Sequence, residues 1–146
     1  MTRTRSVAVA LAFAAALALP TAALAAYNAN DGDAFLREQA KCDAAIETSD
    51  EISIDVYCSA AAEALSLLAS EVVQKNEKWA IFRTLEASDL ICAAASEENH
   101  NSRQASMHLV TATKIIDELV VLFPTAERKQ LQNTAHALIA HFGVAS

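Results

Sequence analysis

Along most of the chain, apolar residues recur at intervals of three and four, the spacing that places them on one face of an α-helix. The clearest run covers residues 51–73, and the positions in register there are Ile54, Cys58, Ala61, Leu65, Leu68 and Val72. Four further segments repeat the pattern. The sequence therefore predicts five helices, over about 34–47, 51–73, 78–97, 103–123 and 126–142.

Polar and turn-forming residues mark the ends of these segments. Thr48-Ser49-Asp50-Glu51 has the spacing of a capping box, Pro124 ends the fourth helix, and Gly143 follows the fifth at a position that glycine favours. Lys75-Asn76-Glu77 is the expected break between the second and third helices, although it contains no glycine or proline, and one continuous helix is the alternative. Because short connections make neighbouring helices antiparallel, we expect an all-α, up-and-down antiparallel bundle of four to five helices.

The composition supports this fold class. Beyond residue 25 the chain contains two glycines, Gly32 and Gly143, and one proline, Pro124. An all-β or α/β chain needs more of both residue types for its turns. The residues that favour helix, such as alanine, leucine and glutamate, are abundant instead.

The first 25 residues carry the features of a cleavable secretory signal peptide. Arg3 and Arg5 precede an uncharged run over 7–19, and small residues follow at 23–25. The run is shorter than the roughly 20 residues of a transmembrane helix. We therefore expect cleavage at Ala25/Ala26 and a periplasmic or secreted product. It is not expected to be a lipoprotein, because the charged Lys41 and the bulky amide of Gln39 stand before the first cysteine where small apolar residues would be needed.

Removing residues 1–25 of 146 leaves 121, which is enough for one domain with its own core. We expect a flexible N-terminal arm over 26–33, with Asp31 or Asp33 capping the first helix. A single helical domain should then cover 34–146.

The mature chain is strongly acidic. Two of the eleven basic residues leave with the signal peptide, so nine remain against eighteen acidic residues, a net charge of −9 with histidine neutral. This charge repels phosphate backbones and anionic headgroups, so we expect no binding to nucleic acid and no membrane insertion after cleavage. The expected partner is another protein.

Three cysteines, Cys42, Cys58 and Cys92, share the local pattern Cys-x-Ala-Ala-x-Glu. On a helix the alanine three residues on lies beside the cysteine and lets a neighbouring helix approach closely, whereas the glutamate five residues on should face water. The midpoints of successive cysteines, Asp50 and Lys75, both fall in expected turns. The three cysteines should therefore be level across three adjacent helices.

In an oxidising compartment two of these cysteines should pair. We expect a Cys42–Cys58 disulfide, because the shorter hairpin fixes its register better. Cys58–Cys92 is the second choice, and three buried, reduced thiols are the alternative. One cysteine is left over in either pairing, and it could be inert in the core or link two chains into an oligomer.

A second hypothesis makes the cysteine layer a metal or redox site. Counting across the last two turns brings histidines level with the cysteines, so the candidate ligands for zinc or copper(I) are Cys42, Cys58, Cys92, His108 and His141. No two cysteines have the close spacing of ordinary metal sites, however. We therefore predict neither a bound metal nor a cofactor.

Ala112, Ile116, Leu119 and Pro124 fall at spacings that resemble the second helix of a tetratricopeptide repeat. The similarity is confined to residues 112–124, because residues 93–106 lack the large aromatic and glycine positions of that repeat's first helix. The resemblance implies a helical hairpin and, as one alternative function, a tetratricopeptide-like adaptor.

Motifs for catalysis are missing from the sequence. So few glycines cannot form a nucleophile elbow, a phosphate-binding loop or a dinucleotide fingerprint. We therefore expect an exported, non-enzymatic helical protein with a structural or protein-interaction role. A periplasmic metal-binding or thiol-redox module is the first alternative.

Overall fold

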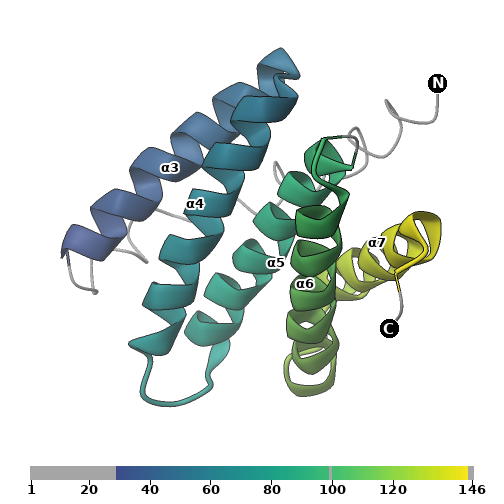
Figure 1. The fold of residues 1–146 in the computed structure, drawn as a ribbon. Coiled ribbons are helices and arrows are strands. Elements are labelled where there is room, and N and C mark those ends of the chain that lie inside the picture. The colour runs from purple at the N-terminus through teal and green to yellow at the C-terminus, as the bar shows by residue number, and fades with distance from the viewer. Residues whose placement is uncertain (1–28, 99, 145–146) are drawn as a thin grey trace.

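The computed structural model describes residues 29–98 and 100–144. Five helices follow one another in this part of the chain: α3 (Ala29–Thr48), α4 (Glu51–Ser70), α5 (Glu77–Glu97), α6 (Ser102–Leu122) and α7 (Ala126–Phe142) (Figure 1). The helical fold class predicted from the sequence is thereby confirmed, and the described residues contain no strand. The expected signal peptide lies outside these residues.

Side chains at the N-termini explain where four of the helices begin. Asp50, Asn76, Asn101 and Thr125 each accept a hydrogen bond from the backbone N–H three residues further on. Each of these bonds satisfies a donor that the first turn of a helix leaves unpaired. At the other end of α7, Gly143 has a φ of 65°, a left-handed conformation that costs glycine little. The predicted break after the second helix exists, so α4 and α5 are separate.

Two boundaries differ from the prediction. α3 begins at Ala29, so residues 29–33 are helical and do not form part of an arm. Asp33, one of the two expected caps, therefore lies inside the helix, near the positive N-terminal end where a carboxylate is stabilised. Residues 26–28 of the expected arm lie outside the described part. α4 ends at Ser70, and residues 71–73, which the apolar spacing placed in the second helix, belong to the loop before α5.

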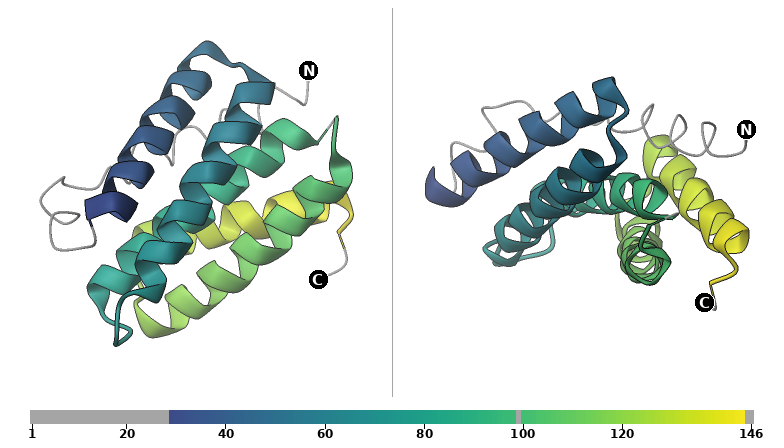
Figure 2. Two further views of the ribbon diagram at one scale, coloured as in Figure 1. Left: turned by 60° about the vertical axis from the view of Figure 1, so that its left-hand side comes forward. Right: turned by 45° about the horizontal axis from the view of Figure 1, so that its top comes forward.

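The helices form an open row. Each packs mainly against the next in sequence, and the other substantial contact within the described residues is a smaller one between α5 and α7. Consecutive helices from α3 to α6 run in opposite directions (Figure 1), and α7 lies obliquely behind α6 (Figure 2). The expected up-and-down order is present, but α3 makes no substantial contact with α6 or α7, as a closed bundle would require.

One apolar core runs along this row. Every helix contributes to it, through residues that include Phe35, Ile54, Phe82, Leu109 and Leu131. α5 lies in the middle and is the most enclosed helix, because every residue from Trp79 to Glu97 is buried except Ile81 and Arg83. A helix enclosed to this degree must bury polar side chains together with its apolar ones.

Of the helices described, α4 alone is long and apolar enough to cross a membrane, with a mean hydropathy of 1.4 over 18 residues. Its buried residues include Ile54, Cys58, Ala61, Leu65 and Leu68, which form the stripe predicted from the sequence. Packing against α3 and α5 therefore accounts for much of the apolar character of this helix. The absence of membrane insertion stays a prediction.

Candidate functional site

Two of the three cysteines form a disulfide. Cys42 on α3 is bonded to Cys58 on α4, with Cα atoms 4.8 Å apart and both residues 0% exposed. This is the first of the two pairings that the helix register predicted. Cys92 on α5 is outside the disulfide and only 2% exposed. A thiol at this depth does not reach a second chain, so Cys92 gives no support to a disulfide-linked oligomer.

The five metal-ligand candidates do not come together. The disulfide removes Cys42 and Cys58, because a metal binds the thiolate form of cysteine. The two histidines contact different carboxylates: His108 Nδ1 lies 2.9 Å from Glu97 Oε1, and His141 Nε2 lies 3.2 Å from Glu98 Oε1. Among the described residues, no three His, Cys, Asp or Glu side chains are arranged to hold a metal ion.

A buried carboxyl group lies beside the disulfide. Asp89 on α5 is 2% exposed, and its Oδ1 is 3.9 Å from Cys42 Sγ and 3.4 Å from the donor Gln39 Nε2. Burial raises the pKa of Asp89 well above its ordinary value, because a carboxylate loses its hydration in the interior. Sequence analysis missed this group, although Asp89 falls in register with the apolar residues Phe82, Leu85 and Cys92 of the same helix.

The surroundings of Cys92 suppress its reactive form. Burial is the main reason that the pKa of this thiol is raised, and the charges of Asp89 and Asp43 add to the effect. Thiol–disulfide exchange and metal binding both need the thiolate. The cysteine layer is therefore a packed part of the core that is poorly suited to redox chemistry.

Glu97 corrects one expectation drawn from the repeated cysteine pattern. Glu47 and Glu63, which hold the same place after the first two cysteines, are exposed as predicted, but Glu97 is 0% exposed. The difference arises because α5 has neighbours on both sides, and Asp55 of α4 and His108 of α6 both lie against Glu97. The periodicity of a single helix does not show how many of its faces are covered.

Two acidic side chains and two histidines thus meet where α4, α5 and α6 join. The pKa of Glu97 is raised to about 7, mainly because the carboxylate is desolvated by burial; His108 opposes this shift and Asp55 adds to it. His108 Nδ1 and Glu97 Oε1 are close but not aligned as a hydrogen bond. His100 Nε2 lies 3.3 Å from Asp55 Oδ2. This cluster connects three helices.

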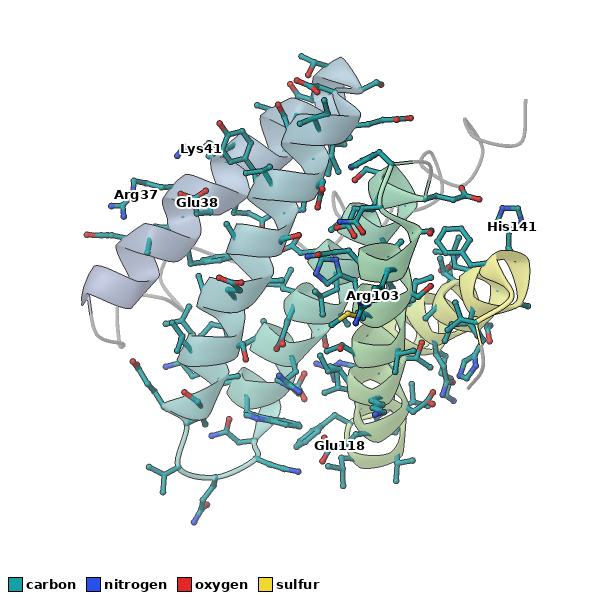
Figure 3. The ribbon with its side chains drawn as sticks, in the orientation of Figure 1. Arg37, Glu38, Lys41, Arg103, Glu118 and His141 are labelled. Carbon is teal, nitrogen blue, oxygen red and sulfur yellow. A yellow bond between two sulfur atoms is a disulfide. The ribbon has the colours of Figure 1, made fainter. Side chains whose placement is uncertain are left out.

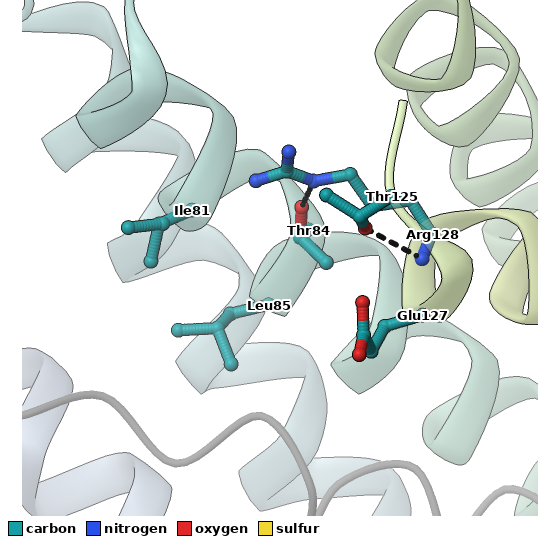
Figure 4. A pocket seen from close by; sticks show the side chains of 6 residues that line it. All are labelled: Ile81, Thr84, Leu85, Thr125, Glu127 and Arg128. Atoms are coloured by element: carbon teal, nitrogen blue, oxygen red, sulfur yellow. Dashed lines mark hydrogen bonds between the residues drawn. The ribbon is translucent and has the colours of Figure 1, made fainter. Parts of the chain in front are cut away.

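A hollow of about 200 Å³ lies between the N-terminal half of α5 and the first turn of α7 (Figure 4). Arg128 is buried beside it, and its guanidinium donates to Thr84 Oγ1 at 3.0 Å, to the carbonyl oxygen of Phe123 at 2.9 Å and to Glu77 Oε1 at 2.7 Å. The hollow is smaller than the roughly 300–1,000 Å³ of ordinary ligand pockets. Arg128 therefore acts as a structural anchor for α7, and the hollow is a weak candidate for a binding site.

The outer face of α4 is the strongest candidate. Three large apolar side chains on this helix are exposed to solvent, namely Ile52 at 70%, Val56 at 56% and Leu67 at 57%. At about 100° per residue they fall within roughly 60° of one another around the helix axis, so they share one face. We call this surface, Ile52, Val56, Glu63 and Leu67, the α4 face. It points away from the core that α4 forms with α3 and α5.

The other large exposed apolar residues do not form a comparable surface. Val73 lies in the loop after α4, and Val121 and Leu122 lie at the C-terminal end of α6. Leu36 stands alone on the described part of α3, and Met107 lies 14 residues before Val121 on α6, where the three exposed side chains spread over about 100° around the helix axis. Among the helices that the structure describes, α4 is the one that presents three such side chains within about 60° of one another around its axis.

The part of α6 that resembles a tetratricopeptide helix is packed in the core. Ala112, Ile116 and Leu119 are each 0% exposed, so their spacing is explained by contacts with the neighbouring helices. Comparison of the whole chain with protein-family models, with curated proteins and with solved structures found no match. The tetratricopeptide adaptor therefore gains no support beyond the helical hairpin itself.

Proposed function

We propose that this protein is an exported, non-enzymatic interaction module that binds another protein through the α4 face. The observation that carries the proposal is the exposure of Ile52, Val56 and Leu67 on one side of a helix whose other side is fully packed. An apolar stripe left in water on a well-packed element is a feature of protein-binding surfaces.

The way in which α4 is held supports this role. The Cys42–Cys58 bond fixes α4 to α3, and α4 also packs along α5. A binding face on a rigid element loses little conformational entropy when a partner docks. The disulfide also supports export, because disulfides persist in oxidising compartments.

The alternative, a metal-binding or thiol-redox module, is less well supported, because it needs free cysteine ligands or a reactive thiol. Two of the proposed ligands are joined to each other, and the third is a buried thiol of raised pKa. A cysteine that reacts with substrates needs exposure and an electropositive setting.

The interaction is tested with a matched pair of double variants. Ile52→Ser/Leu67→Ser removes apolar surface from the α4 face, and Val121→Ser/Leu122→Ser removes it from the end of α6. Both pairs are exposed, so thermal unfolding should change little in either variant. A photo-crosslinking residue at position 56 should capture a partner in cells, and only the α4 variant should lose it. Equal capture by both variants would contradict the proposal.

Export is tested separately. The mature protein should be recovered outside the cytoplasm, and its intact mass should correspond to a chain that begins at Ala26. A protein that keeps Met1 and stays in the cytoplasm would show that this part of the proposal is wrong.

A further inference from the structure

The charges along α4 indicate what kind of partner its outer face accepts. α4 carries the acidic residues Glu51, Asp55 and Glu63 and contains no lysine or arginine. Residues 51–74 as a whole lack a basic side chain. The binding face therefore lies on a stretch of chain whose charged side chains are all acidic.

Glu63 occupies the middle of the α4 face. It lies seven residues after Val56 and four before Leu67, and at about 100° per residue its direction falls between those of Ile52 and Val56. Its side chain is exposed, and within the described part of the chain it forms no ion pair. The face thus has an apolar end, a central carboxylate and a second apolar end.

Lys41, a basic side chain on the neighbouring helix α3, is directed elsewhere. Lys41 on α3 is paired with Glu38 at 3.3 Å, and its ammonium lies 5.3 Å from the ring centre of Tyr57 (Figure 3). Tyr57 is about 120° away from Glu63 around the axis of α4. The central carboxylate is therefore available to a cation that a partner supplies.

Three other occupants fit this face poorly. A neutral apolar helix would bury the Glu63 carboxylate without a counter-charge, which is costly. A second copy of the chain would place one acidic α4 against another, since a two-fold interface brings the same surface of both copies together. An anionic membrane surface would be repelled by the same carboxylates and by the net negative charge of the mature chain.

We infer that the α4 face binds a cationic amphipathic helix of another protein, whose lysine or arginine meets Glu63 between two groups of apolar residues. The inference rests on the proposed function and specifies the partner. Ile52 and Leu67 are 15 residues apart, a rise of about 22 Å, so the bound segment should span about four helical turns. Apolar anchors should supply most of the affinity, and the charge pair should supply register and specificity.

The inference is tested by selection from a displayed library of 18-residue helical peptides, with the purified mature protein as bait. The peptides carry randomised positions on one face. Three bait variants are compared with the wild type: Glu63→Lys, Glu47→Lys and Ile52→Ser/Leu67→Ser. Glu47→Lys is the matched control, because Glu47 is exposed, holds the same place in the cysteine pattern and changes the net charge equally.

The wild-type protein and Glu47→Lys should both enrich peptides with a central lysine or arginine flanked by apolar residues. Glu63→Lys should enrich peptides with a central aspartate or glutamate. A peptide selected on the wild type should bind Glu63→Lys at least about tenfold more weakly and should lose affinity as salt rises.

Enriched peptides without a central cation, or a preference that Glu63→Lys leaves unchanged, would overturn the inference. If those peptides still require Ile52 and Leu67, the proposed function stands and only the partner class is wrong. The inference is also overturned if Ile52→Ser/Leu67→Ser enriches the same peptides as the wild type. It is likewise overturned if analytical ultracentrifugation shows a dimer of the wild-type protein that this double variant abolishes. The crosslinking experiment then decides the proposed function independently.

Discussion

The disulfide should make a large contribution to stability, and its size can be worked out from the fold. Cys42 and Cys58 are separated by 16 residues. In the chain-entropy treatment, closing a loop of that length destabilises the unfolded state by about 3 kcal/mol. Cys42→Ala/Cys58→Ala should lose this contribution. It should also lose the packing of two buried sulfur atoms, at roughly 1 kcal/mol each, by comparison with a buried methylene.

Cys92→Ala is the matched control, because it also removes a buried sulfur atom but leaves the disulfide in place. Urea unfolding should show a loss of about 1 kcal/mol for this variant and of about 5 kcal/mol for the double variant. The dependence of unfolding free energy on urea should also steepen in the double variant, since its unfolded chain exposes more surface.

The reasoning fails if the double variant loses no more than twice what Cys92→Ala loses, because packing alone would then explain the effect. An independent check is the number of thiols that react in the denatured, unreduced protein. One reactive thiol per chain agrees with the structure, and three would refute the disulfide.

Three further predictions concern the buried polar groups. Because burial raises the pKa of Glu97 to about 7, the folded protein keeps a proton that the unfolded chain releases near pH 4.5. Stability should therefore fall as the pH rises through this window, and urea midpoints at pH 5 and pH 8 should differ less in Glu97→Gln than in the wild type. Arg128→Met should cost about 2 kcal/mol in urea unfolding, because the buried hydroxyl and carbonyl that it bonds lose their donor. Glu77→Gln should cost less than about 1 kcal/mol, because the Glu77 side chain is 62% exposed. If Glu77→Gln costs as much as Arg128→Met, the ion pair with Glu77 and not the buried hydrogen bonds is what makes Arg128 stabilising. Cys92 should react with iodoacetamide only after unfolding, so fast labelling of the native protein at neutral pH would contradict its burial.

The sequence was sufficient for the secondary structure and much of the local order. The positions of the helices followed from apolar spacing, and their ends followed from residues such as Pro124 and Gly143. These signals are local, since a cap or a stripe depends on residues within one or two turns. The Cys42–Cys58 pairing could also be predicted as the first choice, because two helices joined by a short turn have a nearly fixed register.

Features that depend on several helices at once were harder to predict. Glu97 was expected in water by analogy with Glu47 and Glu63, and Asp89 was overlooked within an apolar stripe. Both are buried because α5 is covered on more than one side. The sequence predicted an up-and-down bundle, but only the structure shows that its helices form an open row, since short turns fix which helices are neighbours but not whether the first returns to the last.

The sequence by itself therefore determined the helices and their order and favoured the cysteine pair, because each is set by contacts between residues close along the chain. The tertiary structure alone decided which residues are enclosed and which are left outside. Three apolar side chains of α4 stay in water because no other described helix packs on that side, while Asp89 and Glu97 of α5 are buried because α5 has neighbours around it. Burial is a property of the whole assembly of helices, so the candidate binding face could be recognised only once the fold was known.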